Sequence, residues 1–171
     1  MFTDISAEAG SGITKSTSAR GLAVGDLWNS GQLSAVISNM NAHPSLMVNQ
    51  IKSPNHWIAF RTIGTKSNRD GIGARLTLSA AGRLRVDEVR SGSSYSSSSD
   101  MRVHFGLAQT NKVDFVEVRW PSGLQERFTG LRVDLIHDLK EGTGTAVTVG
   151  KKARRILFAP AEQETYILRL L

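Results

Sequence analysis

The sequence predicts an all-β protein built on an antiparallel β-sandwich or barrel-like domain. No long stretch places apolar residues at i, i+3, i+4 and i+7, the spacing of an amphipathic helix. Short strand-like runs recur instead, separated by glycine, by Asn-Arg-Asp-Gly and Pro-Ser-Gly turns and by serine clusters. Because 40% of the residues are apolar but only 6% are aromatic, valine, leucine and isoleucine must supply most of the core.

The first strand-like runs lie in the N-terminal part of the chain. Residues 34–40 and 45–50 are predicted to be two strands around a turn at 41–44. Residues 56–64 (HWIAFRTIG) are apolar on both phases, so we expect both faces of this strand to be covered.

A hairpin is predicted next. In residues 74–80 the side chains of Leu76 and Leu78 alternate with polar ones and point inward. Residues 82–90 follow at once, and Gly82 is expected in the connecting turn.

Residues 101–107 alternate cleanly. Their apolar side chains share one face, namely Met101, Val103, Phe105 and Leu107. Arg102 and His104 therefore share the other face.

Residues 112–121 form a strand whose apolar positions change phase. A bulge near Phe115, or burial of both faces, would explain the change. Pro121 ends this strand, and further strands are expected within 124–131 and 134–142.

The chain contains no cysteine, which excludes disulfides, thiolate metal sites and cysteine nucleophiles. Part of the net charge of +6 lies in the C-terminal segment, where four cations could bind a polyanion: Lys151, Lys152, Arg154 and Arg155. A solvated basic tail is the favoured alternative. No apolar run approaches the roughly 18 residues of a membrane helix, so no membrane span is expected. The start, MFTDISAEAG, lacks a basic segment followed by an apolar stretch, so no signal peptide is expected in this chain.

Four segments carry a family resemblance: NHWIAFRTIGTKSNRDGIGARLTL, EVRSGSSY, MRVHFGL and VDFVEVRWPSG. Together they resemble the ASPIC/UnbV domain family, from about Asn55 to Gly142. The preceding ARGLAVGDLWNSGQLSAVISNMNAHPSLMVNQ resembles a β-propeller repeat of the FG-GAP/VCBS type. The resemblance implies a degenerate repeat (a partial propeller blade) at 1–54, an ASPIC/UnbV-like β domain at 55–150, and a basic and apolar extension at 151–171.

The same resemblance implies the C-terminal part of a larger protein, secreted or at the cell surface, whose upstream propeller blades are absent from this chain. A lone blade cannot bury its faces without neighbours, so we expect it to dock on the domain that follows. The expected role is a non-catalytic binding or assembly module, with an extracellular glycan or protein as partner. Binding of a polyanion or nucleic acid through the tail is the first alternative, and hydrolysis is the second.

The loop GDLWNSGQLSAV has the frame of a repeat-type calcium loop. Its ligand positions fall on Asp26, Trp28, Ser30 and Ser34, with Gly31 as the turn glycine. Calcium prefers about six to eight oxygen ligands, whereas this loop offers one carboxylate and an indole that cannot ligate. We therefore expect a lost calcium site and no cofactor, with Asp26 capping the turn by accepting local backbone N–H groups.

Two loops are candidate ligand sites. In SNRDGIGAR the candidates are Asn68, Arg69 and Asp70, although a structural turn is favoured there. Beside the serine-rich loop SGSSYSSSS the candidates are Arg90, Ser91 and Tyr95, which could bind a sugar through guanidinium, hydroxyl and ring contacts. A mobile loop with an incidental tyrosine is the equal alternative.

His104 is the last candidate. A Ser–His–Asp arrangement would pair it with Ser91 and with Asp70 or Asp100, but the sequence has no nucleophile elbow. A strand histidine that neighbouring groups satisfy is favoured. Trp57 and Trp120 are expected in the core, although an exposed tryptophan would suit sugar stacking.

Overall fold

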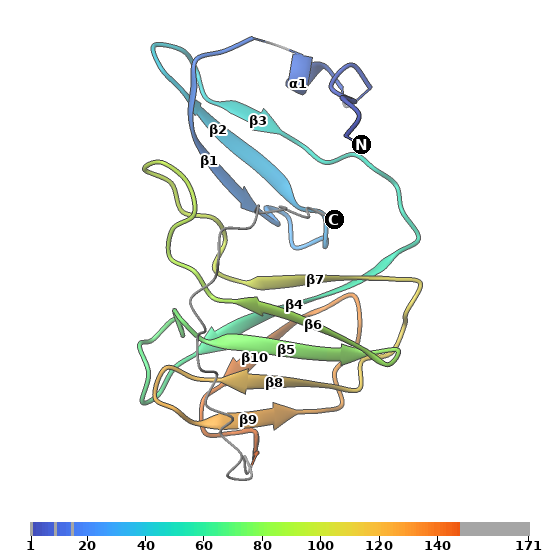
Figure 1. The fold of residues 1–171 in the computed structure, drawn as a ribbon, viewed down its shortest axis with the longest axis vertical. Coiled ribbons are helices and arrows are strands. Elements are labelled where there is room, and N and C mark those ends of the chain that lie inside the picture. Colours follow the sequence, from blue (N-terminus) through green and yellow to red (C-terminus); the bar gives the residue numbers. More distant parts are fainter. Residues whose placement is uncertain (1, 9, 15, 148–171) are drawn as a thin grey trace, which may run out of the picture.

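The computed structural model describes residues 2–8, 10–14 and 16–147. Within them the chain forms one short helix and eleven strands in three sheets (Figure 1). The elements are α1 (Ser11–Thr14), β1 (Ala19–Gly25), β2 (Ser34–Asn39), β3 (Ser45–Met47), β4 (His56–Ile63), β5 (Arg75–Ala80), β6 (Arg83–Glu88), β7 (Val103–Ala108), β8 (Phe115–Arg119), β9 (Gln125–Phe128), β10 (Ile136–Lys140) and β11 (Thr145–Ala146). The all-β prediction is confirmed.

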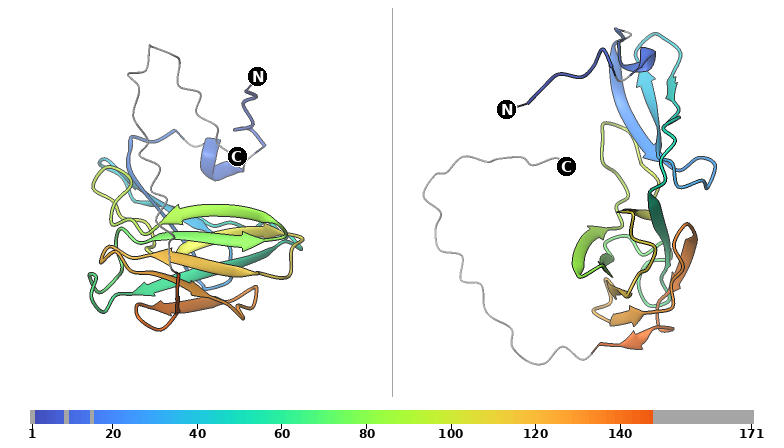
Figure 2. Two further views of the ribbon diagram at one scale, coloured as in Figure 1. Left: turned by 60° about the horizontal axis from the view of Figure 1, so that its bottom comes forward. Right: turned by 90° about the vertical axis from the view of Figure 1, so that its right-hand side faces the viewer.

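Two of the sheets form a sandwich. One has the order β10-β4-β7 and the other β11-β9-β8-β5-β6, and Figure 2 shows them packed face to face. The fully buried side chains between them include Ile58 and Phe60 from β4 and Leu76 and Leu78 from β5. Burial of these apolar groups drives the two sheets together. The predicted antiparallel pairing holds throughout except between β4 and β10, which run parallel.

The predicted alternation is largely confirmed. Val103, Phe105 and Leu107 are buried, while Met101 precedes β7 and is 38% exposed. The β5–β6 turn has positive φ at both Ala81 and Gly82, as a two-residue hairpin of type I′ requires.

Of the two explanations offered for the phase change at Phe115, the bulge is wrong. Pairing of β8 with β5 runs without a shift from Phe115 to Arg119, and the phase changes because the buried Val113 precedes the strand. Phe115 is covered on its outer side by Arg127, whose guanidinium carbon lies 4.0 Å from the ring centroid. The sandwich has its register shift instead between β4 and β7, at His56 and Trp57.

Strands β1, β2 and β3 form a separate antiparallel sheet, called here the N-terminal sheet, at one end of the sandwich (Figure 2). Its apolar side chains are covered incompletely: Leu22 is 42%, Val36 38% and Leu46 54% exposed. Among the described residues, no strand pairs with the outer edge of β3. The sheet is therefore a unit with surface left for neighbours, and its assignment to a propeller repeat stays a prediction.

The basic residues of the predicted tail, Lys151, Lys152, Arg154 and Arg155, lie outside the described residues. In the described part of the chain, no helix has the length and apolar character needed to cross a membrane.

Candidate functional site

The outer face of β4 and β7 meets the loop that follows β1, at residues 26–33. We call this contact, together with the docking of the serine-rich loop 91–99 on β1, the joint. Arg102 enters it from the start of β7 and donates from Nη2 to the carbonyl oxygen of Asp26 at 2.8 Å and from Nη1 to the side-chain oxygen of Asn29. Its Nε donates to Asp100 at 2.7 Å.

His104, two residues after Arg102 and on the same face, also binds this loop. Its Nε2 lies 3.0 Å from the carbonyl oxygen of Gly31, and its ring is parallel to the indole of Trp57, with the centroids 5.7 Å apart. Burial lowers the pKa of His104 and outweighs the opposing hydrogen bond to Gly31. The predicted face shared by Arg102 and His104 is thus the face that docks the N-terminal sheet.

Gly31 must be glycine in this arrangement. Its φ is +81°, and a Cβ would lie 2.1 Å from the indole of Trp57. The backbone of the loop can therefore lie directly against the ring.

The loop with the calcium-loop frame is closed by hydrogen bonds from its own backbone. The carboxylate of Asp26 accepts the N–H groups of Ser30 at 2.9 Å and Gly31 at 2.7 Å, which confirms the predicted cap. The hydroxyl of the buried Ser34 accepts the N–H of Asn49 at 3.2 Å. Within the described residues, no three His, Asp or Glu side chains gather in a metal-ligand cluster. The loss of calcium from this loop stays a prediction.

The serine-rich loop 91–99 docks along the free edge of β1. The N–H groups of Leu22 and Val24 donate to the hydroxyls of Ser94 and Ser99, each at 3.2 Å. The carbonyl oxygen of Val24 accepts the N–H of Asp100 at 2.9 Å. Serine side chains thus satisfy an exposed strand edge, a partnership that the low-complexity composition does not reveal.

The sugar site at Arg90, Ser91 and Tyr95 stays a prediction. Arg90, which follows β6, pairs with Glu88 at 3.1 Å, and Tyr95 is 72% exposed. In the described part of the chain, no hydrogen bond or ion pair joins these three side chains.

The Asn68-Arg69-Asp70 loop is a built turn. The Asn68 amide bonds both the N–H and the carbonyl oxygen of Ile72, each at 2.8 Å, and Thr62 donates to the Asp70 carbonyl oxygen at 2.8 Å. Arg69 pairs with Asp70 at 3.1 Å, and its hydrogen bond holds the pKa of Asp70 below the usual value.

This loop borders a groove of about 590 Å³, called here the arginine groove. Its three guanidinium groups all have carboxylate partners: Arg61 pairs with Asp138, Arg69 with Asp70 and Arg102 with Asp100. A ligand would have to compete with these internal pairs.

The predicted catalytic pairing receives no geometric support from hydrogen bonding. Among the described residues, no hydrogen bond links the Ser91 hydroxyl to His104, whose Nε2 is engaged by Gly31. The favoured alternative, a strand histidine satisfied by neighbouring groups, describes these contacts.

Sequence reasoning missed two buried carboxylates, Glu126 and Glu141. Glu141 accepts the N–H groups of Thr65, Lys66 and Ser67, each at 2.8 Å, and the hydroxyl of Ser122. Burial alone would raise the pKa of Glu141, but these hydrogen bonds outweigh it and lower the pKa to about 2.

Glu126 joins another set of distant groups. It accepts Trp120 Nε1 at 2.7 Å and the N–H groups of Gly142 and Gly144, each at 2.9 Å. The donors to both carboxylates come from separate segments, so no local motif marks either residue.

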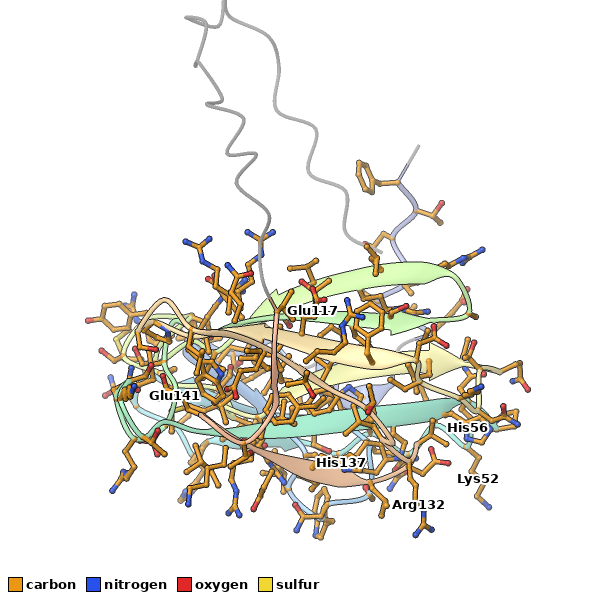
Figure 3. All side chains as sticks on the ribbon, turned by 90° about the horizontal axis from the view of Figure 1, so that it is seen from below. Lys52, His56, Glu117, Arg132, His137 and Glu141 are labelled. Atoms are coloured by element: carbon orange, nitrogen blue, oxygen red, sulfur yellow. The ribbon has the colours of Figure 1, made fainter. Side chains whose placement is uncertain are left out.

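A second groove, of about 480 Å³, lies at the other side of the joint. We call it the tryptophan groove, because Trp57 lies in it between the 49–56 connection, loop 30–32 and β7. At its end, His56 Nδ1 lies 2.7 Å from the carboxylate of Asp134, which also accepts the N–H of Trp57 at 3.1 Å. Figure 3 shows His56 and Glu141 at opposite ends of the sandwich, so this groove is remote from the Glu141 network.

Comparison with known families adds one finding. No curated protein matched the chain. Residues 64–146, just under half of the chain, match the family model described as ASPIC and UnbV. This stretch runs from the end of β4 to β11, whereas the N-terminal sheet lies outside it. Residues 64–146 are therefore similar to the ASPIC/UnbV domain family.

Proposed function

We propose that this chain is a non-catalytic binding and assembly module of an extracellular or cell-surface protein, the C-terminal part of a larger FG-GAP-type repeat protein. In this proposal residues 1–54 are a degenerate repeat, 55–150 are the ASPIC/UnbV-like domain and 151–171 are an extension. The sandwich holds the N-terminal sheet in one orientation and presents its free surface to partners.

The joint is the observation that carries the proposal. Arg102, which precedes β7, and His104 in β7 both reach backbone carbonyl oxygens of the loop after β1. The serine-rich loop accepts hydrogen bonds from the edge of β1. A hydrogen bond to a charged group, such as the guanidinium of Arg102, contributes more to stability than a bond between neutral groups. The sandwich therefore fixes the sheet through several independent bonds.

A non-catalytic role is supported by how the reactive side chains are engaged. His104 bonds a carbonyl oxygen, while Glu126 and Glu141 each accept several internal donors. A catalytic acid or base needs an accessible group with a pKa near the working pH. With a pKa of about 2, Glu141 does not meet that need.

The first alternative is binding of a polyanion by Lys151, Lys152, Arg154 and Arg155. Binding through these cations would fall steeply with salt, because counterions compete for both surfaces. The second alternative, a hydrolase built on Ser91 and His104, predicts ester or peptide turnover that a Ser91→Ala variant loses.

The test is binding of the chain to a panel of glycans and polyanions at low and physiological salt, beside a chain that ends at Gly150. Salt-resistant binding of one class that the shorter chain keeps is the expected result. Binding that disappears with salt and with the removed residues would instead support the polyanion alternative. If neither chain bound any glycan or polyanion, the proposed role would be limited to assembly.

A further inference from the structure

We propose that the tryptophan groove is a binding site for a neutral saccharide. This inference deepens the proposed binding function by naming a site and a ligand class. The groove combines an aromatic ring, neutral amides and an open floor.

The aromatic part is held rigidly. Trp57 is half-buried, parallel to His104, and bonded through its backbone N–H to Asp134. Sugar rings present apolar C–H faces that pack on such a flat ring. Within the described residues, the indole Nε1 has no hydrogen-bond partner and is not among the buried unpaired atoms, and the backbone of Gly31 lies against this part of the ring.

Three side-chain amides along the groove each have one polar atom in an internal hydrogen bond and the other without a partner among the described residues. Gln32 donates from Nε2 to the Ile51 carbonyl oxygen at 2.8 Å, so its Oε1 is left to accept. Asn49 accepts the Ile51 N–H at 3.0 Å and Asn55 accepts Gln109 Nε2 at 2.8 Å, so both Nδ2 groups are left to donate. In the described structure none of these remaining atoms has a partner.

Such half-used amides suit a polyhydroxylated ligand. Each is already oriented by an internal bond, so little side-chain entropy is lost when it binds. A hydroxyl group can both donate and accept, and can therefore satisfy Oε1 and Nδ2 groups alike.

The floor of the groove is open beside the indole. Gly106 is paired directly with Trp57 across β4 and β7, and a Cβ at Gly106 would meet no atom within 4 Å. The register shift between His56 and Trp57 occurs at this place, with Ala108 at a φ of +51°. Bulges often re-aim side chains at binding sites.

The charge of the lining favours a neutral ligand. Among the described residues, no lysine or arginine lines this groove, and the Asp134 carboxylate is paired with His56. The arginine groove offers the opposite chemistry, since its three cations are held by internal carboxylates. In the described part of the chain, the tryptophan groove offers a sulfated or phosphorylated ligand no free counter-charge.

The test is titration of the full chain with maltohexaose, cellohexaose and mannohexaose, followed by calorimetry and by the indole N–H signal of Trp57. Binding of at least one hexasaccharide is expected, unchanged by high salt, with a shift of that signal. Gly106→Phe should abolish binding because its ring fills the open floor.

Trp28→Ala is the matched control for an exposed tryptophan outside the groove, and it should bind as the wild type does. If the unfolding temperature of Gly106→Phe is close to that of the wild type, the variant is folded, and its loss of affinity comes from a blocked groove. Failure of all three hexasaccharides to bind, or binding that Gly106→Phe leaves intact, would overturn the proposal. Either result concerns the groove alone and leaves the contacts of the joint unchanged. Failure of the proposed assembly role would be detected by a different measurement, the orientation of the N-terminal sheet relative to the sandwich.

Discussion

The guanidinium of Arg102 donates to the carbonyl oxygen of Asp26 across the boundary between the sandwich and the N-terminal sheet, over 2.8 Å. These residues are far apart in sequence. The Asp26 side chain faces the other way and caps its own loop through Ser30 and Gly31. One residue thus orders the loop with its carboxylate and ties it to the sandwich with its backbone.

Replacing Arg102 with Ala should loosen the joint. A hydrogen bond to a charged group contributes about 2 kcal/mol, so amides that report on docking should exchange with solvent about tenfold faster or more. The reporters are the N–H groups of Leu22 and Val24, measured by hydrogen–deuterium exchange.

Arg61→Ala is the matched control. It removes another arginine–aspartate pair from the same sandwich face, but that pair is largely exposed and should contribute little. If the amides of Leu22 and Val24 exchanged at the same rate in the Arg102→Ala and Arg61→Ala variants, Arg102 would not stabilise the joint.

Gly21 should not tolerate a side chain. A Cβ there would lie 2.1 Å from the Ser97 hydroxyl oxygen and 2.6 Å from the Tyr95 carbonyl oxygen. We expect Gly21→Ala to lower the free energy of unfolding by about 1–3 kcal/mol, measured in urea, because the serine-rich loop must shift. Gly106→Ala, also in a strand, serves as control and should change stability by no more than about 0.5 kcal/mol. A stable Gly21→Ala variant would show that the loop is not packed against β1.

The low pKa of Glu141 leads us to expect that the folded chain loses stability in acid. Its pKa is about 2 in the folded chain against an ordinary 4.5, so the folded state favours the ionised form. The stability it contributes is present above pH 4.5 and is lost as the pH falls from about 4.5 to about 2. Glu141→Gln should be less stable at neutral pH by about 2 kcal/mol or more, with a flatter acid profile, measured by urea unfolding at each pH. Parallel acid profiles for both chains would refute this role.

The lowered pKa of His104 leads us to expect a second pH effect, a loss of amide protection at the joint nearer neutral pH. Burial lowers its pKa from 6.5, so the unfolded or undocked state takes up a proton more readily than the docked state. Protection of the joint is therefore present above pH 6.5 and should decline as the pH falls below it. Exchange of the Leu22 and Val24 amides, corrected for the intrinsic rate at each pH, measures this. Amides of Leu76 and Leu78 in the sandwich core should stay protected, and equal loss at all four would indicate global unfolding instead.

The sequence predicts much of the sandwich because its signals are local. Alternation in residues 101–107 identifies both the core face and the face shared by Arg102 and His104, and the Gly82 turn follows from backbone rules. Apolar residues on both phases of 56–64 correctly indicate a strand covered on both faces, since Ile58, Ala59 and Phe60 are all buried.

The sites depend on contacts that no local pattern encodes. The donors to Glu141 come from residues 65–67 and from Ser122, and the partner of His104 is a backbone carbonyl group. The tryptophan groove likewise needs Trp57, loop 30–32 and Gly106 to be brought together by the fold. The sequence predicts both Trp57 and Trp120 in the core, which is confirmed for the buried Trp120 and wrong for the half-buried Trp57. Only the tertiary structure distinguishes the two.

In the proposed assembly role, the sandwich holds the N-terminal sheet in one orientation. Residual dipolar couplings of backbone amides in residues 19–47 and 56–146 measure this orientation. We expect one alignment tensor, with one magnitude, to fit both sets. Two tensors of different magnitude or orientation would show that the sheet moves independently of the sandwich, and would contradict the proposed assembly role.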